Sequence, residues 1–124
     1  MATDQSMVCI NLEAGQDLSA KQYYFVTMAS DGQVDPTGDG LSADGVLQDA
    51  PSAAGYPASI AISGRTKVVA GAAIARGANV ASGAAGKAKT SATGNRVLGV
   101  ALEAAAADGD VISILLKVQG HPNT

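Results

Sequence analysis

The sequence predicts an all-β fold in a single small domain. Apolar runs of strand length, rich in β-branched or aromatic residues, alternate with glycines and Asp-Gly pairs that are typical of turns. No long segment free of glycine shows a 3.6-residue apolar period, which argues against helices. The length of 124 residues suits one domain and is too short for two of ordinary size.

The expected strands are short and lie between turn signals. They span residues 22–29, 45–48, 59–63, 67–70, 79–81, 87–91, 97–102 and 111–118. The turns at 83–86 and 92–95 are expected to close hairpins into the strands that follow them. The alanine-rich segment 103–107 predicts one helical turn, because alanine is the best helix former. At most one or two helical turns are therefore expected.

A closed barrel is favoured over an open sheet by one spacing in the middle of the chain. Ile74, Gly77 and Val80 place an apolar anchor, a tight glycine turn and a strand start three residues apart. Small β-barrels use such an arrangement at their corners. We therefore expect a small single-domain β-barrel with short hairpins.

The hydrophobic core is expected to be thin. Only 26 of the 124 residues are Val, Ile, Leu or Phe, whereas 25 are Ala. Burial contributes about 25 cal/mol per Å² of apolar surface and has to offset roughly 1 to 2 kcal/mol of backbone entropy per residue. Such a core favours further burial against neighbouring subunits or a larger surface.

Charge is distributed unevenly along the chain. The net charge is −3, but residues 1–50 carry eight acids and one base, Lys21, while residues 51–124 carry seven bases and three acids. This asymmetry can orient like subunits head to tail or one face toward an oppositely charged surface, or it can reflect solvated acidic loops alone. The acidic balance and the position of Tyr23, Tyr24 and Phe25 in the acidic half disfavour a nucleic-acid partner.

The N-terminal residues predict a strand or an arm. Met7, Val8, Ile10 and Leu12 are apolar positions that could add a strand to a neighbour's sheet edge. We therefore expect an arm over 1–12, a domain over 13–120 and a flexible tail over 121–124. No signal peptide or apolar run long enough for a membrane span is expected, and the lone Cys9 excludes an internal disulfide.

Metal and cofactor motifs are incomplete. Asp35, Thr37, Asp39 and Gly40 match the first half of a calcium loop, but Val46 stands where a bidentate Glu is required, so turn aspartates are the better interpretation. The segment 83–88 has two residues between its glycines where a phosphate loop needs four. No metal or cofactor is predicted.

Catalytic constellations are equally weak. The chain has one histidine, His121, which lies near the C-terminus, while Cys9 lies near the N-terminus. A nucleophile and base held rigidly together are therefore not expected. Acids at turn dipeptides are usually solvated and poorly suited to general acid catalysis. We predict that the protein is not an enzyme.

Three segments, in order, resemble the small capsid cement or decoration proteins of tailed phages. They are Gly15 to Ser19 (GQDLS), Ala70 to Ile74 with Gly77, and the alanine-rich stretch Thr93 to Asp110. Ala78 departs from the pattern, because an acidic residue is frequent there.

The resemblance implies a β-barrel or β-tulip that assembles, usually as a homotrimer, on the outer surface of an icosahedral head. It would be made in the host cytoplasm, bind the major capsid protein and stabilise the capsid lattice. Met7, Val8, Ile10 and Leu12 would then contact the capsid or a neighbouring subunit, and deleting residues 1–12 would abolish attachment while leaving the barrel folded. A glycan- or receptor-binding module displayed on the virion is the alternative.

Overall fold

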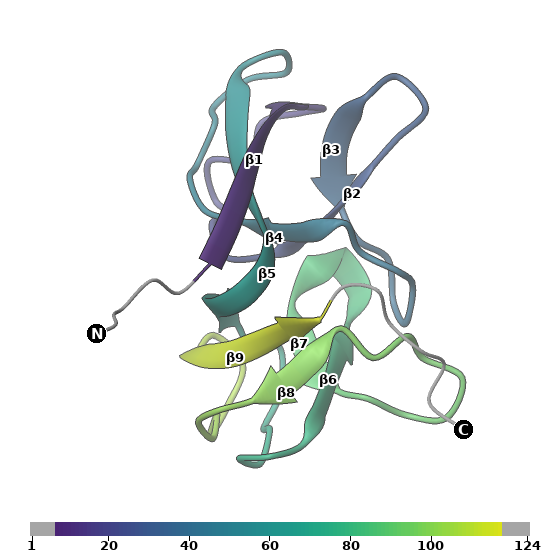
Figure 1. Ribbon diagram of the computed structural model, residues 1–124, viewed down its shortest axis with the longest axis vertical. Coiled ribbons are helices and arrows are strands. Elements are labelled where there is room, and N and C mark those ends of the chain that lie inside the picture. The colour runs from purple at the N-terminus through teal and green to yellow at the C-terminus, as the bar shows by residue number, and fades with distance from the viewer. Residues whose placement is uncertain (1–6, 118–124) are drawn as a thin grey trace.

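The structure, a computed structural model, describes residues 7–117 and is built almost entirely of β-strands (Figure 1). The described strands are β1 (Met7–Ala14), β2 (Phe25–Met28), β3 (Gln33–Pro36), β4 (Gly45–Leu47), β5 (Pro57–Val69), β6 (Asn79–Ser82), β7 (Ala88–Thr90), β8 (Gly99–Ala101) and β9 (Val111–Lys117). One short 3₁₀ helix, η1, covers Ala84–Gly86. The all-β prediction is confirmed.

The strands form one sheet whose first part closes on itself. The order is β1-β3-β2-β4-β5-β9-β8-β6-β7, and β1 also pairs with β5, which closes a ring of five strands. The thirteen-residue β5 belongs to both halves: its first part pairs with β1 and β4, and its second part pairs with β9. Figure 1 shows the ring strands in the upper part and β6 to β9 in the lower part.

Strands β2, β4 and β5 form a wall between two hydrophobic cores. Successive side chains of a strand point to opposite faces. The core shared with the C-terminal half accordingly contains Phe25, Val46 and Ala61. The core inside the ring contains their sequence neighbours Val26, Leu47 and Ile60. Both faces of this wall are buried, which explains its continuous apolar runs.

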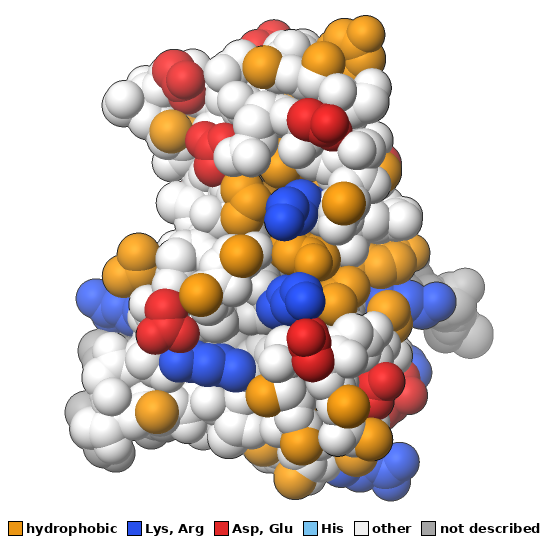
Figure 2. Space-filling view, turned by 180° about the vertical axis from the view of Figure 1, so that it is seen from behind, with side chains coloured by type: hydrophobic (Ala, Val, Ile, Leu, Met, Phe, Trp, Pro, Cys, Tyr) orange, Lys and Arg blue, Asp and Glu red, His pale blue; other side chains and the backbone are white. Residues whose placement is uncertain are grey.

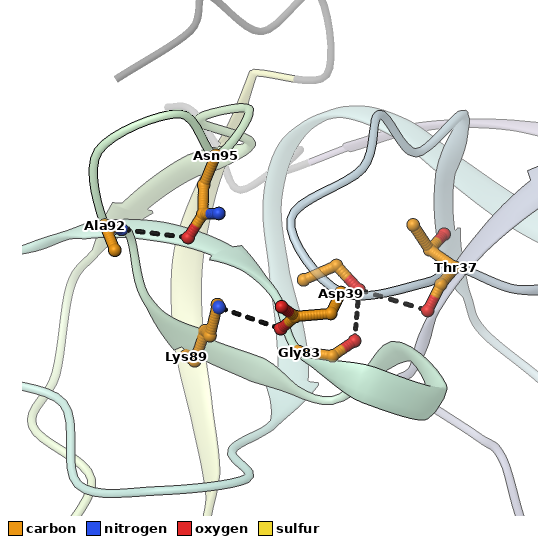
Figure 3. A network of polar contacts seen from close by, with 7 residues as sticks. Thr37, Asp39, Gly83, Lys89, Ala92 and Asn95 are labelled. Atoms are coloured by element: carbon orange, nitrogen blue, oxygen red, sulfur yellow. Dashed lines mark hydrogen bonds and ion pairs between the residues drawn. The ribbon is translucent and has the colours of Figure 1, made fainter. Parts of the chain in front are cut away.

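The loop between β3 and β4 fastens the two halves together (Figure 3). The amide of Gly40 donates to the carbonyl oxygen of Ser82 at 2.8 Å, and Lys89 Nζ lies 2.8 Å from Asp39 Oδ1. The Ser82 hydroxyl lies 3.3 Å from the carbonyl oxygen of Thr37. The loop therefore contacts β6 and β7 mainly through its backbone, with one exposed ion pair beside it.

Two strand predictions require correction. The expected strands at 59–63 and 67–70 are parts of the single strand β5, which continues through Gly64 with a positive φ of 95°. Strand β3 was not expected, because its four residues include Asp35 and Pro36. It forms because Asp31 and Gly32 turn the chain and the Gln33 amide donates to Asp31 Oδ1 at 2.9 Å, which starts an antiparallel pairing with β2.

Two connections also differ from expectation. The turn at 83–86 closes the β6–β7 hairpin as predicted, but the turn at 92–95 does not close a hairpin, because β8 pairs with β6 and β9. The helical turn expected over 103–107 is absent: Ala105 instead forms an extended bridge with Ile74. Tertiary pairing has overridden the helix propensity of alanine there.

Strand β1 runs through the expected boundary between an arm and a domain at residue 12. Residues 7–13 pair with β5 of the same chain, so the described part of the expected arm belongs to the ring. The expected tail at 121–124, including His121, lies outside the described residues. No helix among residues 7–117 is long and apolar enough to cross a membrane.

Candidate interaction surface

One face of β1 passes from the inside of the ring to the molecular surface. Val8, Ile10, Leu12 and Ala14 occupy alternate positions and share this face. Their exposure falls along the strand, from 55% for Val8 and 40% for Ile10 to a partly buried Leu12 and a fully buried Ala14. The structure thus brings three predicted contact residues, Val8, Ile10 and Leu12, together in what we call the β1 surface; Met7 begins the same strand.

The backbone of β1 is open along one edge. One edge pairs with β5 from Met7 to Glu13, but on the other edge β3 pairs only with Glu13 and Ala14. From Val8 to Leu12 this second edge has no strand partner among the described residues, and it carries neither a charge nor a proline. Charges and prolines are common means of protecting an edge from pairing with another chain. Within residues 7–117 this edge is therefore unpaired and lacks these two means of protection.

A second exposed surface lies on the outer face of β5 and β9. Arg65 stands opposite Leu115, and Val69 stands opposite Val111, so these side chains point to the same side as Lys67. Val111 is 50% and Leu115 37% exposed. We call Arg65, Lys67, Val111 and Leu115 the basic face. Between Val111 and Leu115, Ser113, which stands opposite Lys67, is buried, so this face of β9 is exposed only in part.

A carboxylate, that of Glu103, forms a hydrogen bond with the backbone of β9 at the edge of the basic face. Glu103 Oε2 accepts a hydrogen bond from the Ser113 amide at 3.0 Å. This hydrogen bond lowers the pKa of Glu103 below its ordinary value of 4.5, and the nearby Arg65 and Arg76 lower the pKa further. The ionised side chain therefore helps to fix the chain around residue 103 against β9.

Replacing Glu103 with Gln is expected to lower stability in a pH-dependent way. Because the folded pKa lies below the unfolded one, the stabilisation by the carboxylate is complete above pH 4.5 and is lost as the pH falls toward the folded pKa. The difference in melting temperature between wild type and E103Q should thus shrink between neutral pH and pH 3. An equal difference at both ends of that range would contradict an ionic origin.

The incomplete metal motif forms no site. Asp35 Oδ1 accepts a hydrogen bond from Gln16 at 2.9 Å, Thr37 is buried, and Asp39 pairs with Lys89. No cluster of potential metal ligands occurs among residues 7–117. Cys9 is exposed on β1.

The residues of the other rejected motifs have structural positions. The glycine segment at 83–86 forms η1 within the β6–β7 hairpin, as a turn interpretation predicts. Phe25 is fully buried, and Tyr24 is buried with Lys21 Nζ 5.1 Å from its ring centre. None of these side chains is presented for stacking on nucleic-acid bases.

A surface hollow of about 340 Å³ lies beside η1 and β7. Its lining includes small residues and two ion pairs, Lys87 with Asp108 at 2.9 Å and Lys89 with Asp39 at 2.8 Å. Asp108 raises the pKa of Lys87 through their hydrogen bond. Because each lysine of the hollow already has a carboxylate partner, it is a poor site for a charged ligand.

The sequence singled out the residues of the β1 surface but not those of the basic face. The alternation of Arg65 and Lys67 with Thr66 and Val68 signals one exposed and one buried face. The sequence does not show that β9 is the neighbour, because pairing across more than 40 residues depends on register.

Comparisons with known proteins agree with this architecture. Among solved structures, the chain resembles the head fiber gp8.5 N base of bacteriophage phi29, with a TM-score of 0.69 and 20% sequence identity over 90% of this chain and 94% of that chain. At this level of identity the likeness shows a shared fold. No curated protein matches the chain. A model of the phage cement protein family matches residues 3–118. Since this match covers nearly the whole sequence, the chain belongs to the phage cement protein family.

Proposed function

We propose that the protein binds the outer surface of the phage head and stabilises the lattice of the major capsid protein. The observation that carries this proposal is membership of the phage cement protein family over residues 3–118. The fold shared with the base of a phage head fiber supports attachment to a head. The role is structural, not catalytic, and is exercised on the virion after synthesis in the host cytoplasm.

The β1 surface is the proposed contact with the capsid. It offers exposed apolar side chains, Val8 and Ile10, beside an unpaired strand edge. Apolar contact supplies affinity, and an open edge can accept main-chain hydrogen bonds from an extended segment of the partner. Met7 and Leu12 flank these residues on the same strand and complete the proposed contact.

Stabilisation of the lattice follows from bridging. A protein that contacts two neighbouring capsid subunits must be released or deformed before those subunits separate. A homotrimer would contact several subunits at once, and linked contacts strengthen one another without any new type of interaction. The thin core is consistent with such an assembly, because packing against partners adds buried apolar surface.

Deleting residues 1–12 cannot test the proposed capsid contact, because these residues include part of the ring. Removing residues 1–12 would take away most of β1 and expose the β5 edge and the core residues that β1 covers, including Ile60 and Ala58. Loss of attachment would then follow from unfolding. Point substitutions on the exposed face of β1 separate the two effects.

We expect the double variant V8T/I10T to bind heads about thirtyfold more weakly than wild type. Threonine keeps the β-branched shape that suits a strand but replaces one methyl group of Val8 and the ethyl group of Ile10 with a hydroxyl. Burying the two half-exposed side chains would contribute about 1 kcal/mol each, and 1.4 kcal/mol corresponds to tenfold in affinity. Co-sedimentation of purified protein with expanded heads that lack it measures the affinity.

The matched control is Leu41→Thr, which removes an exposed apolar side chain from the β3–β4 loop. L41T should bind as wild type does, and both variants should keep the wild-type circular dichroism spectrum. Heads carrying wild-type protein should also retain their DNA to a higher temperature than bare heads. Glycan binding by the isolated protein, together with indifference to heads, would favour the alternative of a displayed binding module.

A further inference from the structure

The fold converts the charge asymmetry of the sequence into two separate ends of the molecule. Among the described residues, 7–50 carry seven acids and one lysine, whereas 51–117 carry seven bases and three acids. In Figure 2 the upper part of the surface shows acidic side chains, whereas the lysines and arginines in view lie across the middle and lower parts, with some acidic side chains beside them. The molecule is therefore electrically polar along its long axis.

The acidic end is organised around the β2–β3 hairpin. Asp31 in its turn accepts from the Gln33 amide, Asp44 Oδ2 accepts from the Met28 amide at 2.6 Å, and Asp35 lies on β3 itself. Glu13, at the end of β1, stands opposite Gln33. Met28 ends β2, is 48% exposed and donates its amide to Asp44, but it stands opposite Val34 and so on the other face of the hairpin from Asp35. We call Glu13, Met28, Asp31, Asp35 and Asp44 the acidic hairpin.

The basic face has the complementary composition. Two cationic side chains, Arg65 and Lys67, flank the exposed apolar residues Val111 and Leu115 on one side of a two-stranded surface. The acidic hairpin likewise combines an exposed apolar side chain with charges of the opposite sign. Glu103, at the edge of the basic face, is already engaged by the Ser113 amide, and Asp110, which precedes Val111, accepts from the amides of Ala106 and Ala107. The basic face thus lacks a free carboxylate of its own.

The partner that fits both surfaces is a second copy of this chain. Each copy carries one surface of each kind, and they lie on different halves of the fold. Neither surface is complementary to itself, because two basic faces or two acidic hairpins would repel each other. Pairing one kind with the other gives a heterologous contact, which closes into a ring when the rotation between copies allows.

We propose that the acidic hairpin of one copy docks on the basic face of the next, in a head-to-tail, salt-sensitive contact. This proposal rests on the proposed function, which includes self-association of the chain. It adds which two surfaces associate. The β1 surface stays available for the capsid, since it includes none of these residues. Charges at the contact steer association, and screening extends over about 8 Å at physiological ionic strength.

The test uses charge reversal in the full chain, with sedimentation velocity at low and high salt. Wild type should associate at 50 mM salt and at least about tenfold more weakly at 500 mM. R65E/K67E should raise the dissociation constant at least about thirtyfold, because like charges then face each other. The quadruple variant R65E/K67E/E13K/D31K has two charges reversed on each surface. It should regain association, because opposite charges face each other again. That recovery is the decisive expectation.

Two further variants keep the result interpretable. K21E/R96E changes the net charge from −3 to −7, as R65E/K67E does, but lies outside both surfaces, and it should associate as wild type does. If D31K fails to fold, E13Q/D31N replaces it: both substitutions keep a hydrogen-bond acceptor and remove charge. Added to R65E/K67E, they should then relieve part of the repulsion.

Several outcomes overturn the proposal. One is a wild-type chain that stays monomeric at millimolar concentration and on heads. Another is association that R65E/K67E leaves intact. A third is loss of head binding by R65E/K67E with unchanged self-association, which would assign the basic face to the capsid. Failure of wild type to bind heads, with the charge-reversal pattern intact, would instead contradict the proposed function and leave this inference standing.

Discussion

Replacing Phe25 with alanine is expected to destabilise the protein by about 3 to 5 kcal/mol, a large part of the roughly 5 to 15 kcal/mol that holds a domain together. Phe25 is the single phenylalanine of the chain and is fully buried in the core shared by the ring and the C-terminal half. Many of its neighbours in this core are alanines, which cannot reach into the space that its ring would leave. The cavity would therefore persist.

The position of Phe25 on the dividing wall adds a second expectation. Its strand also supplies Val26 to the core inside the ring, and its carbonyl oxygen accepts the Thr37 amide at 2.9 Å. A loosened wall should weaken both cores together. Urea unfolding of F25A, monitored by circular dichroism, should show a single transition with its midpoint at a lower urea concentration than in wild type.

Tyr56→Ala is the control, because it removes an exposed aromatic side chain and should change stability by less than about 0.5 kcal/mol. Loss of less than about 1 kcal/mol in F25A would show that the core closes around the gap. Two separate transitions would show that the wall does not couple the cores.

The sequence predicted where strands form better than how they pair. The turn residues mark several strand ends correctly: Asp31 and Gly32 follow the end of β2, and segment 83–86 joins β6 to β7. Such signals are local, because a positive φ or a side-chain hydrogen bond to the backbone involves only neighbouring residues. The register of β1 on β5 and of β5 on β9 links distant segments.

The misplaced features have a common physical cause. The turn at 92–95 was expected to join neighbours, but the Leu98 amide donates to the Val80 carbonyl oxygen, and β8 takes its place beside β6. Segment 103–107 was expected to be helical, but the Ala105 and Ile74 backbones exchange hydrogen bonds in both directions at 2.8 and 3.0 Å. In both segments, long-range backbone pairing prevails over a local preference of well under 1 kcal/mol per residue.

The candidate surfaces were predictable to different degrees. The alternation of Val8, Ile10 and Leu12 on a strand follows from sequence, whereas their graded exposure depends on where the ring ends. The charge asymmetry between the two halves was visible in the composition. Its concentration on the acidic hairpin and the basic face depends on pairing between β2 and β3 and between β5 and β9.

Replacing Gly45 with alanine is expected to cost about 2 to 3 kcal/mol, although it adds a single methyl group. Gly45 begins β4 and pairs with Val26, and a Cβ atom there would meet the carbonyl oxygen of Ala61 and come within 2.5 Å of Ile60 Cγ2. The obstacle includes backbone of β5. That backbone cannot retreat freely, because Ala61 and Ile60 also pair with Cys9 and Ile10 on the opposite edge.

The expected damage therefore reaches the β1 surface. Urea unfolding measures the loss of stability, and hydrogen exchange at the amides of Ile10 and Leu12, which face β5 as the Ala14 amide does, should be faster in G45A than in wild type. Gly83→Ala is the matched control: its φ of −87° suits any residue, and the nearest atom to an added Cβ is the Lys87 carbonyl oxygen at 3.2 Å. It should cost less than about 1 kcal/mol and leave β1 unchanged.

The pattern of exchange decides how the ring positions its contact strand. Faster exchange in β1 with unchanged exchange in β9 would mean that β4 and β5 hold β1 in place, so the exposure of Val8 and Ile10 depends on a glycine more than 30 residues away. Wild-type stability of G45A would contradict this, because it would require β5 to shift without cost. If β4 and β5 do hold β1 in place, head binding should weaken in G45A in proportion to the disturbance of β1, while G83A should bind as wild type does.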